Sequence, residues 1–142
     1  MNFSDAKEED FDEAFAFICD LWDYNTYDRE TVRKVYKEVL MDANTFAFFL
    51  EEDGEYKGFC QGDFFHTFWM SGLTCYVSGI ITRRGEREKG YGTKMMDHVK
   101  ELAIERGCKA VILDSGMPRE KAHRFYEGYG FEKSCYGFEM AL

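Results

Sequence analysis

The sequence is poor in proline, in paired cysteines and in basic residues. Its 142 residues include one proline and five cysteines, an odd number without any C-x-x-C pair. This pattern disfavours a disulfide framework and a structural zinc site, so we predict no metal. We expect small buried side chains at Cys19, Cys60, Cys75, Cys108 and Cys135.

Long apolar stretches are also missing. The longest strongly apolar run, Phe46 to Leu50, is much shorter than a membrane span, and the first residues lack the basic and apolar regions of a signal peptide. The 27 acidic residues outnumber the 18 basic ones and give a net charge of -9. We therefore predict a cytoplasmic protein whose partners include no membrane and no nucleic acid.

The patterns that are present indicate one domain over residues 1–142, because 45% of the residues are hydrophobic and the length suits one core. Periodicity predicts the order β-α-α-β-β-β-α-β-α-β, an α/β fold (α+β sandwich) whose mixed, largely antiparallel sheet is flanked by helices. Asp28 is a predicted helix cap, and Asp53-Gly54 a predicted hairpin turn. The expected helices are 11–22, 28–40, 92–107 and one opened by Pro118, and the expected strands include 45–51, 56–69, 73–82, 110–114 and 131–142.

The segment from Arg87 to Gly92 lies between a predicted strand and a predicted helix. Backbone N–H groups at a helix start have no partner within the helix, and glycine lets an anion come close to the backbone. From Arg83 to Lys94 there are five basic and two acidic residues. The segment therefore suits an anion, although a glycine turn with solvated charges has the same composition, and the Walker and Rossmann patterns are absent.

Two motifs carry a resemblance to a known family. R-x-x-G-x-G at residues 87–92 and A-x-x-F-Y at residues 122–126, followed by Gly130-Phe131, resemble the signatures of the GCN5-related N-acetyltransferases (GNAT). The chain is most similar to their compact members, which acetylate small amines. The resemblance implies acetyl-CoA as co-substrate and direct attack by a primary amine.

The resemblance also assigns residues to the co-substrate. It implies that Ile80, Ile81 and Thr82 pair through their backbone with the pantetheine arm, and that Tyr126 donates a proton to the sulfur of CoA. Arg119 departs from the family pattern, which often has asparagine there; its cation suits a CoA phosphate or a solvent-exposed carboxylate. His123 would flank the co-substrate or serve packing. The pyrophosphate would be bound by the N–H groups of Arg87, Glu88, Lys89, Gly90, Tyr91, Gly92 and Thr93.

The general base is not indicated by the family pattern. Many relatives carry a carboxylate on the strand before the loop, but residues 76–79 here include no acid. His66 and Asp63, on the preceding strand, could reach a shared cleft directly or through water. His66 is the candidate base, although a histidine on a strand is also compatible with a structural role. His98 falls on the polar face of its helix and is expected to be solvated.

Aromatic and acidic residues follow the first predicted helix. Trp22, Tyr24 and Tyr27, with Asp20, Asp23 and Asp28 among them, suit an acceptor that carries an ammonium group, although a packed loop would look alike. Residues 1–57 hold 16 acids and 6 bases, which weakly favours a small cationic amine. A protein or peptide acceptor and a non-catalytic acyl-CoA-binding regulatory domain remain alternatives, and homodimerisation stays open.

Overall fold

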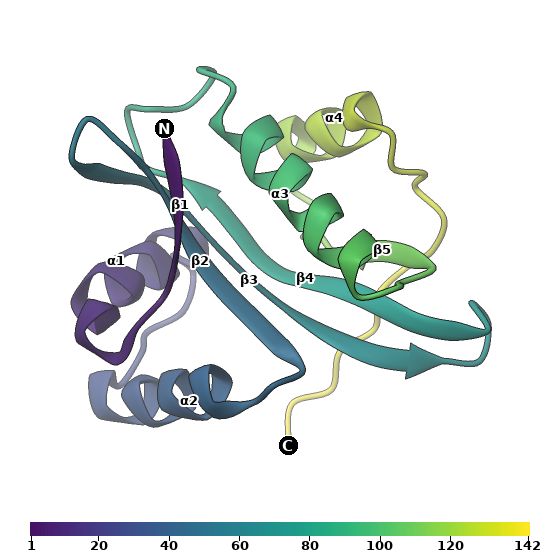
Figure 1. The fold of residues 1–142 in the computed structure, drawn as a ribbon, viewed down its shortest axis with the longest axis horizontal. Coiled ribbons are helices and arrows are strands. Elements are labelled where there is room, and N and C mark those ends of the chain that lie inside the picture. The colour runs from purple at the N-terminus through teal and green to yellow at the C-terminus, as the bar shows by residue number, and fades with distance from the viewer. The chain divides into compact units, whose positions relative to one another are not determined.

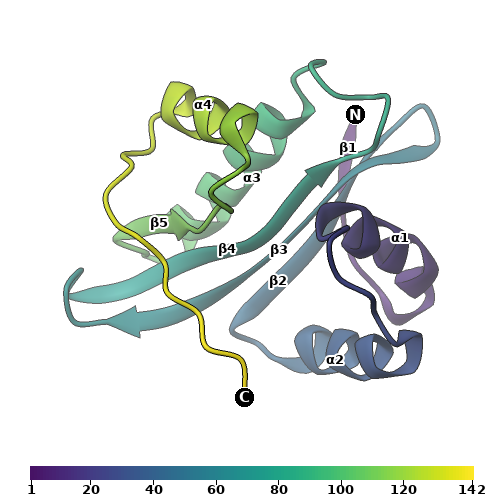
Figure 2. The ribbon, with the colours of Figure 1, turned by 180° about the vertical axis from the view of Figure 1, so that it is seen from behind.

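The computed structural model describes residues 1–142 and shows two compact units, Met1–Ile112 and Leu113–Leu142. The organisation as a single domain stays a prediction. Figure 1 and Figure 2 show the elements from opposite sides. They are β1 (Asn2–Asp5), a 3-10 turn (Glu8–Asp10), α1 (Phe11–Leu21), α2 (Arg29–Met41), β2 (Thr45–Glu52), β3 (Glu55–Thr67), β4 (Gly72–Thr82), α3 (Tyr91–Glu105), β5 (Ala110–Leu113) and α4 (Glu120–Tyr129).

The five strands form one sheet in the order β1-β2-β3-β4-β5, and β1 to β4 pair antiparallel. The hairpin between β2 and β3 turns at Asp53 and Gly54, whose φ angles of +55° and +75° suit a two-residue turn of the primed type. The predicted α/β fold class is confirmed. The predicted hairpin turn is confirmed as well.

The pairing of β3 with β4 contains a β-bulge. Gly62 lies opposite Val77 and Gln61 lies opposite Gly79, so that Ser78 is an extra residue on β4. A bulge interrupts the ladder and turns nearby side chains to new directions. It therefore separates the first part of β4 from the segment Ile80–Thr82.

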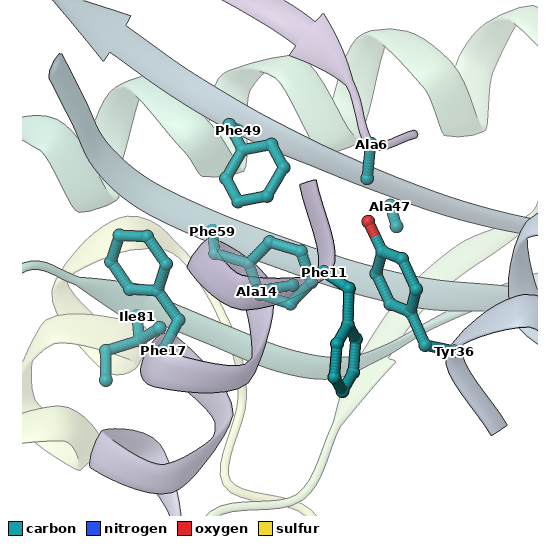
Figure 3. Close-up of a cluster of buried hydrophobic side chains, with 9 residues drawn as sticks. All are labelled: Ala6, Phe11, Ala14, Phe17, Tyr36, Ala47, Phe49, Phe59 and Ile81. Carbon is teal, nitrogen blue, oxygen red and sulfur yellow. The ribbon is translucent and has the colours of Figure 1, made fainter. Parts of the chain in front are cut away.

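The two faces of the sheet are covered differently. Helices α1 and α2 gather on one face, and α3 packs on the other (Figure 1). On that face, a Cβ at Gly58 would be 2.7 Å from the sulfur of Met95 on α3. Figure 3 shows the cluster that joins α1 and α2 to the sheet. It consists of Ala6, Phe11, Ala14, Phe17, Tyr36, Ala47, Phe49, Phe59 and Ile81.

Helix α2 begins where the sequence predicts. The Asp28 carboxylate accepts hydrogen bonds from the Thr31 backbone N–H at 3.0 Å and from the Thr31 hydroxyl at 2.6 Å. These bonds favour the charged carboxylate and lower the pKa of Asp28. The predicted cap is confirmed.

Three expectations from the sequence are wrong. Residues 131–142 form no strand, and no neighbouring strand satisfies their backbone groups. His98 is not solvated on a polar face, because its ring stacks on Phe3 at 4.2 Å and meets the ring of Phe48 edge-on. Of the five cysteines only Cys60 and Cys75 are buried; Cys135 is exposed.

Candidate active site

The start of α3 offers unpaired backbone donors. Gly90 precedes the helix with a φ of +84°, a conformation that glycine adopts without strain, and no side chain caps the helix. The N–H groups of Tyr91, Gly92 and Thr93 belong to the first turn and have no acceptor within the helix. This end of α3 therefore fits an anionic oxygen group, as the loop motif implies.

The basic side chains around this loop are mostly paired with acids. Arg84 lies 2.5 Å and Arg87 3.7 Å from Asp20 on α1. Arg83 lies 3.6 Å from Glu13, and Lys89 donates to Glu86 at 2.7 Å. The local surplus of basic residues is thus largely neutralised within the protein. The backbone N–H groups, rather than free cations, are the main feature for an anion.

A buried cation fixes the loop to the sheet. The ammonium group of Lys57 on β3 donates to Glu55 at 2.9 Å and to Glu86 in the loop at 3.1 Å, and these bonds raise the pKa of Lys57. Lys57 is 7% exposed. A buried charge needs such partners, so the network holds the loop before α3 in place. The sequence pattern did not indicate this residue, because nothing local distinguishes it from a solvated lysine.

Tyr91 fixes the first residue of α3. Its hydroxyl donates to the Glu52 carboxylate at the end of β2, which raises the pKa of Tyr91 to about 12 and lowers the pKa of Glu52. The ring itself is buried. The helix start is therefore held on two sides, by Glu52 and by the Lys57 network.

The last part of β4 has a backbone edge that β5 does not reach. Lys109 donates its N–H to the carbonyl of Leu73, so β5 begins beside the start of β4, and it is only four residues long. At about 3.3 Å per residue it ends well before Ile80–Thr82. An extended ligand that carries amide groups can pair with such an edge. This fits the pantetheine role that the resemblance implies for Ile80, Ile81 and Thr82.

Trp22 lies against β4 next to the bulge. A Cβ at Gly79 would be 3.0 Å from the indole and 3.0 Å from the Leu21 side chain, so a larger residue there would push these side chains back by a few tenths of an ångström. Tyr27 donates its hydroxyl to the Trp22 carbonyl at 3.3 Å, while Tyr24 is 73% exposed. The structure thus places Trp22 against β4, with Tyr27 hydrogen-bonded to its backbone, and leaves Tyr24 in solvent.

The three acids of this turn have different surroundings. Asp20 holds Arg84 and Arg87, and Asp28 caps α2, so both already have structural partners. Asp23 is exposed. An acidic pocket made by all three, as considered from the sequence, is therefore not what the structure shows.

Asp63 and His66 lie on opposite faces of β3, because successive side chains of a strand alternate and the two are three residues apart. His66 is exposed near the turn to β4. Asp63 is partly buried and accepts a hydrogen bond from the Ser78 hydroxyl at 2.7 Å. The shared cleft suggested for the two residues is not formed, and Asp63 is the one beside the bulge.

The second unit carries the other residues that the resemblance assigns. On α4, the Tyr126 ring is partly buried and meets Phe125 and Phe131 edge-on, at 5.4 Å and 5.9 Å. The Nε2 atom of His123 lies 2.9 Å from the Gly116 carbonyl oxygen, and Arg119 is the residue that precedes α4. Their roles toward the co-substrate remain proposals.

The buried thiols are unreactive. Burial raises the pKa of Cys60, and it raises the pKa of Cys75 to about 12. The thiolate is the nucleophilic form of cysteine, so neither residue is suited to carry an acyl group at neutral pH.

Asp20 offers a test of the loop. We expect Asp20→Asn to strengthen acetyl-CoA binding up to about fivefold. Ion pairs with exposed cations such as Arg84 and Arg87 stabilise by about 1 kcal/mol at most, and their loss frees both arginines for phosphate. Isothermal titration at low and high salt measures this, and the gain should shrink at high salt. Weaker binding in the variant would contradict the prediction.

An uncapped helix follows a glycine loop, beside a strand edge that an extended ligand can pair with. This arrangement fits a phosphate-bearing ligand with an amide chain. The sequence profile of the Acetyltransferase (GNAT) family matches residues 7–131. The protein belongs to this family. It is an enzyme, an N-acetyltransferase that uses acetyl-CoA.

Named relatives support this assignment. The aminoalkylphosphonate N-acetyltransferase of Salmonella typhimurium is 26% identical over 141 residues, which cover 96% of this chain and 88% of the relative. A transcriptional regulator from Bacillus halodurans has a TM-score of 0.89 at 25% identity, over 99% of both chains. The aminoglycoside N-acetyltransferase AAC(6')-Iy, solved with CoA, has a TM-score of 0.88 at 15% identity, over 99% of this chain and 93% of that one, and shows the same fold. None of the helices has the length and apolar character needed to cross a membrane.

Proposed function

We propose that the protein transfers the acetyl group of acetyl-CoA to a primary amine of a small cationic molecule, by direct attack and without a covalent enzyme intermediate. The observation that carries this proposal is that the Trp22 indole approaches Gly79 and that Asp63 accepts a hydrogen bond from Ser78, so an aromatic ring and a carboxylate meet β4 at adjacent residues. An aromatic face and a carboxylate are the two groups that select an ammonium ion. The proposal takes the chain as one catalytic domain, in the cytoplasm.

Each part of the mechanism falls to named groups of this chain. Acetyl-CoA supplies an acyl group activated as a thioester. The N–H groups of residues 87–93 hold its pyrophosphate, and the backbone of Ile80–Thr82 holds the pantetheine arm. An N–H of β4 stabilises the charge that develops on the carbonyl oxygen. Tyr126 donates its phenolic proton to the departing sulfur.

The names of the relatives support a small acceptor but differ in its charge. An aminoalkylphosphonate carries an anionic group beside its amine, whereas an aminoglycoside is a polycation. The first 57 residues have a net charge of -10, which repels a phosphonate. We therefore favour polycationic amines.

Two other functions follow from the same fold. A protein or peptide acceptor would need a longer contact surface, and the enzyme would then be nearly inactive on free amines. A regulatory domain that binds acyl-CoA without turnover is the other alternative from the sequence. The absence of a carboxylate on residues 76–79 and the similarity to the transcriptional regulator from Bacillus halodurans fit it, but the match to the acetyltransferase family argues against it. Fold alone does not distinguish these functions.

A panel of amines tests the proposal. We expect CoA release with aminoglycosides or polyamines, with kcat/KM at least about tenfold above that for aminophosphonates and for peptides with a free N-terminus, because of the acidic first half of the chain. Release of CoA is measured with a thiol reagent. Turnover only with peptides would favour a protein acceptor, and acetyl-CoA binding without any turnover would favour the regulatory domain.

A further inference from the structure

The position of Asp63 follows from the alternation of β3. Gly58 faces α3, and Phe59 faces α1 within the cluster of Figure 3. The pairing of β2 with β3 has no irregularity between Phe59 and Asp63, so the odd-numbered residues up to Asp63 keep the α1 face. Trp22 approaches Gly79 on the same face. Asp63 and the Trp22 indole thus lie on one side of the sheet, beside the bulge.

The bulge gives Asp63 a fixed partner. Ser78 is the extra residue of β4, and its hydroxyl donates to the Asp63 Oδ2 atom at 2.7 Å. One hydrogen bond orients the carboxylate and leaves further lone pairs for another donor, since a carboxylate accepts about four hydrogen bonds. Bulges often redirect a side chain beside a functional site. Here the bulge positions a carboxylate that β4 itself lacks.

Aromatic groups lie beside this carboxylate. Tyr76 is the register partner of Asp63, and its ring meets the Phe65 ring edge-on at 6.4 Å. Ser78 is two residues, or about 7 Å along the strand, from Ile80, where the segment proposed to hold the pantetheine arm begins. An ammonium group bound at Asp63 would therefore be close to the acyl group.

We propose that Asp63, positioned by Ser78, binds the ammonium group of the acceptor and accepts its proton. This inference rests on the proposed function. The ammonium loses two protons as it becomes an amide. One passes to the Asp63 carboxylate and then to solvent, and the nitrogen lone pair forms the C–N bond as the C–S bond breaks. The second leaves the nitrogen for solvent, while Tyr126, having given its proton to the sulfur, takes one back from solvent.

Asp63→Asn tests the proposal through its pH dependence. We expect kcat/KM for the best amine of the panel to fall about 100-fold at pH 7, within the range for loss of a general base, with acetyl-CoA affinity within about twofold. The deficit should shrink as the pH approaches about 10.4, because the amine is then unprotonated without help. A purely structural role would give a loss independent of pH. Ser78→Ala keeps the Asp63 carboxylate but removes the hydrogen bond that orients it, so kcat/KM should fall about tenfold.

Asp53→Asn is the matched control. It removes the same charge in the turn just before β3, where Asp53 has a φ of +55° that asparagine tolerates. Both kcat/KM and the acetyl-CoA affinity should stay within about twofold of the wild type. Thermal unfolding of each variant confirms its fold. Activity of Asp63→Asn equal to the wild type, or a deficit that does not change with pH, would overturn the proposal.

A binding measurement separates this proposal from the proposed function. Spermidine is titrated into the CoA-saturated protein, and we expect Asp63→Asn to bind it at least about tenfold more weakly. If the wild type binds spermidine through Asp63 but releases no CoA with any amine, the ammonium site stands and the transferase proposal fails. If the two proteins bind spermidine equally, or neither binds it, the Asp63 site is refuted whatever the turnover.

Discussion

The double variant Gly90→Asp, Gly92→Asp is expected to bind acetyl-CoA at least about 100-fold more weakly than the wild type. Both changes place a carboxylate where the unpaired N–H groups of α3 face the proposed pyrophosphate. Two like charges about 5 Å apart repel by about 3 kcal/mol at an effective dielectric constant of 20, and about 2.8 kcal/mol corresponds to 100-fold. Isothermal titration with acetyl-CoA measures the loss.

The fold should survive this change. A Cβ at Gly90 meets no atom within 4 Å, and aspartate adopts the left-handed conformation more readily than most residues. Aspartate in the first turn of a helix is also favourable. Gly90→Asn, Gly92→Asn is the control for size, and it should lose clearly less affinity than the aspartate variant because it adds similar bulk without the charge. Equal losses in both double variants would mean that shape rather than charge is responsible, and unchanged binding would remove the loop from the co-substrate site.

The local features of this protein were predictable because neighbouring residues determine them. The Asp28 cap needs Thr31 three residues later, and the hairpin needs only Asp53 and Gly54. The glycine loop ahead of α3 is equally local. The sequence therefore predicts the mixed fold and the glycine-led start of α3, while anion binding at this start stays a prediction.

Features that depend on distant pairing were not predictable. The bulge at Ser78 exists only in the register between β3 and β4, and Lys57 becomes a buried cation only when Glu86 comes beside it. His98 has polar neighbours along its helix but meets Phe3 from the first strand. A strand over residues 131–142 was predicted from their composition, but a strand also needs a neighbouring strand to pair with, and composition does not show whether one is present. The sequence does not identify the general base for the same reason: the bulge that brings Ser78 to Asp63 depends on the pairing of β3 with β4.

Tyr126→Phe is expected to lower kcat about 100-fold while acetyl-CoA affinity stays within about twofold. The change removes one hydroxyl and keeps the ring, whose edge-on contacts with Phe125 and Phe131 persist. Loss of a general acid typically costs at least about 100-fold. The departing thiolate has a reference pKa of about 8.5, so it leaves without a proton more readily at high pH. The ratio of wild-type to variant kcat should therefore be largest at low pH and fall above about pH 8.5.

Tyr129→Phe is the control for this variant. It makes the same change on the same helix, where the Tyr129 ring contacts Phe125 and Phe131 at 6.2 Å and 6.0 Å, and it should leave kcat within about twofold. Single-turnover measurements with saturating acetyl-CoA separate the chemical step from product release, which limits kcat in many enzymes. If Tyr126→Phe turns over as fast as Tyr129→Phe across the pH range, water rather than Tyr126 protonates the sulfur. If both variants lose activity equally, the effect belongs to the packing of α4 and not to proton transfer.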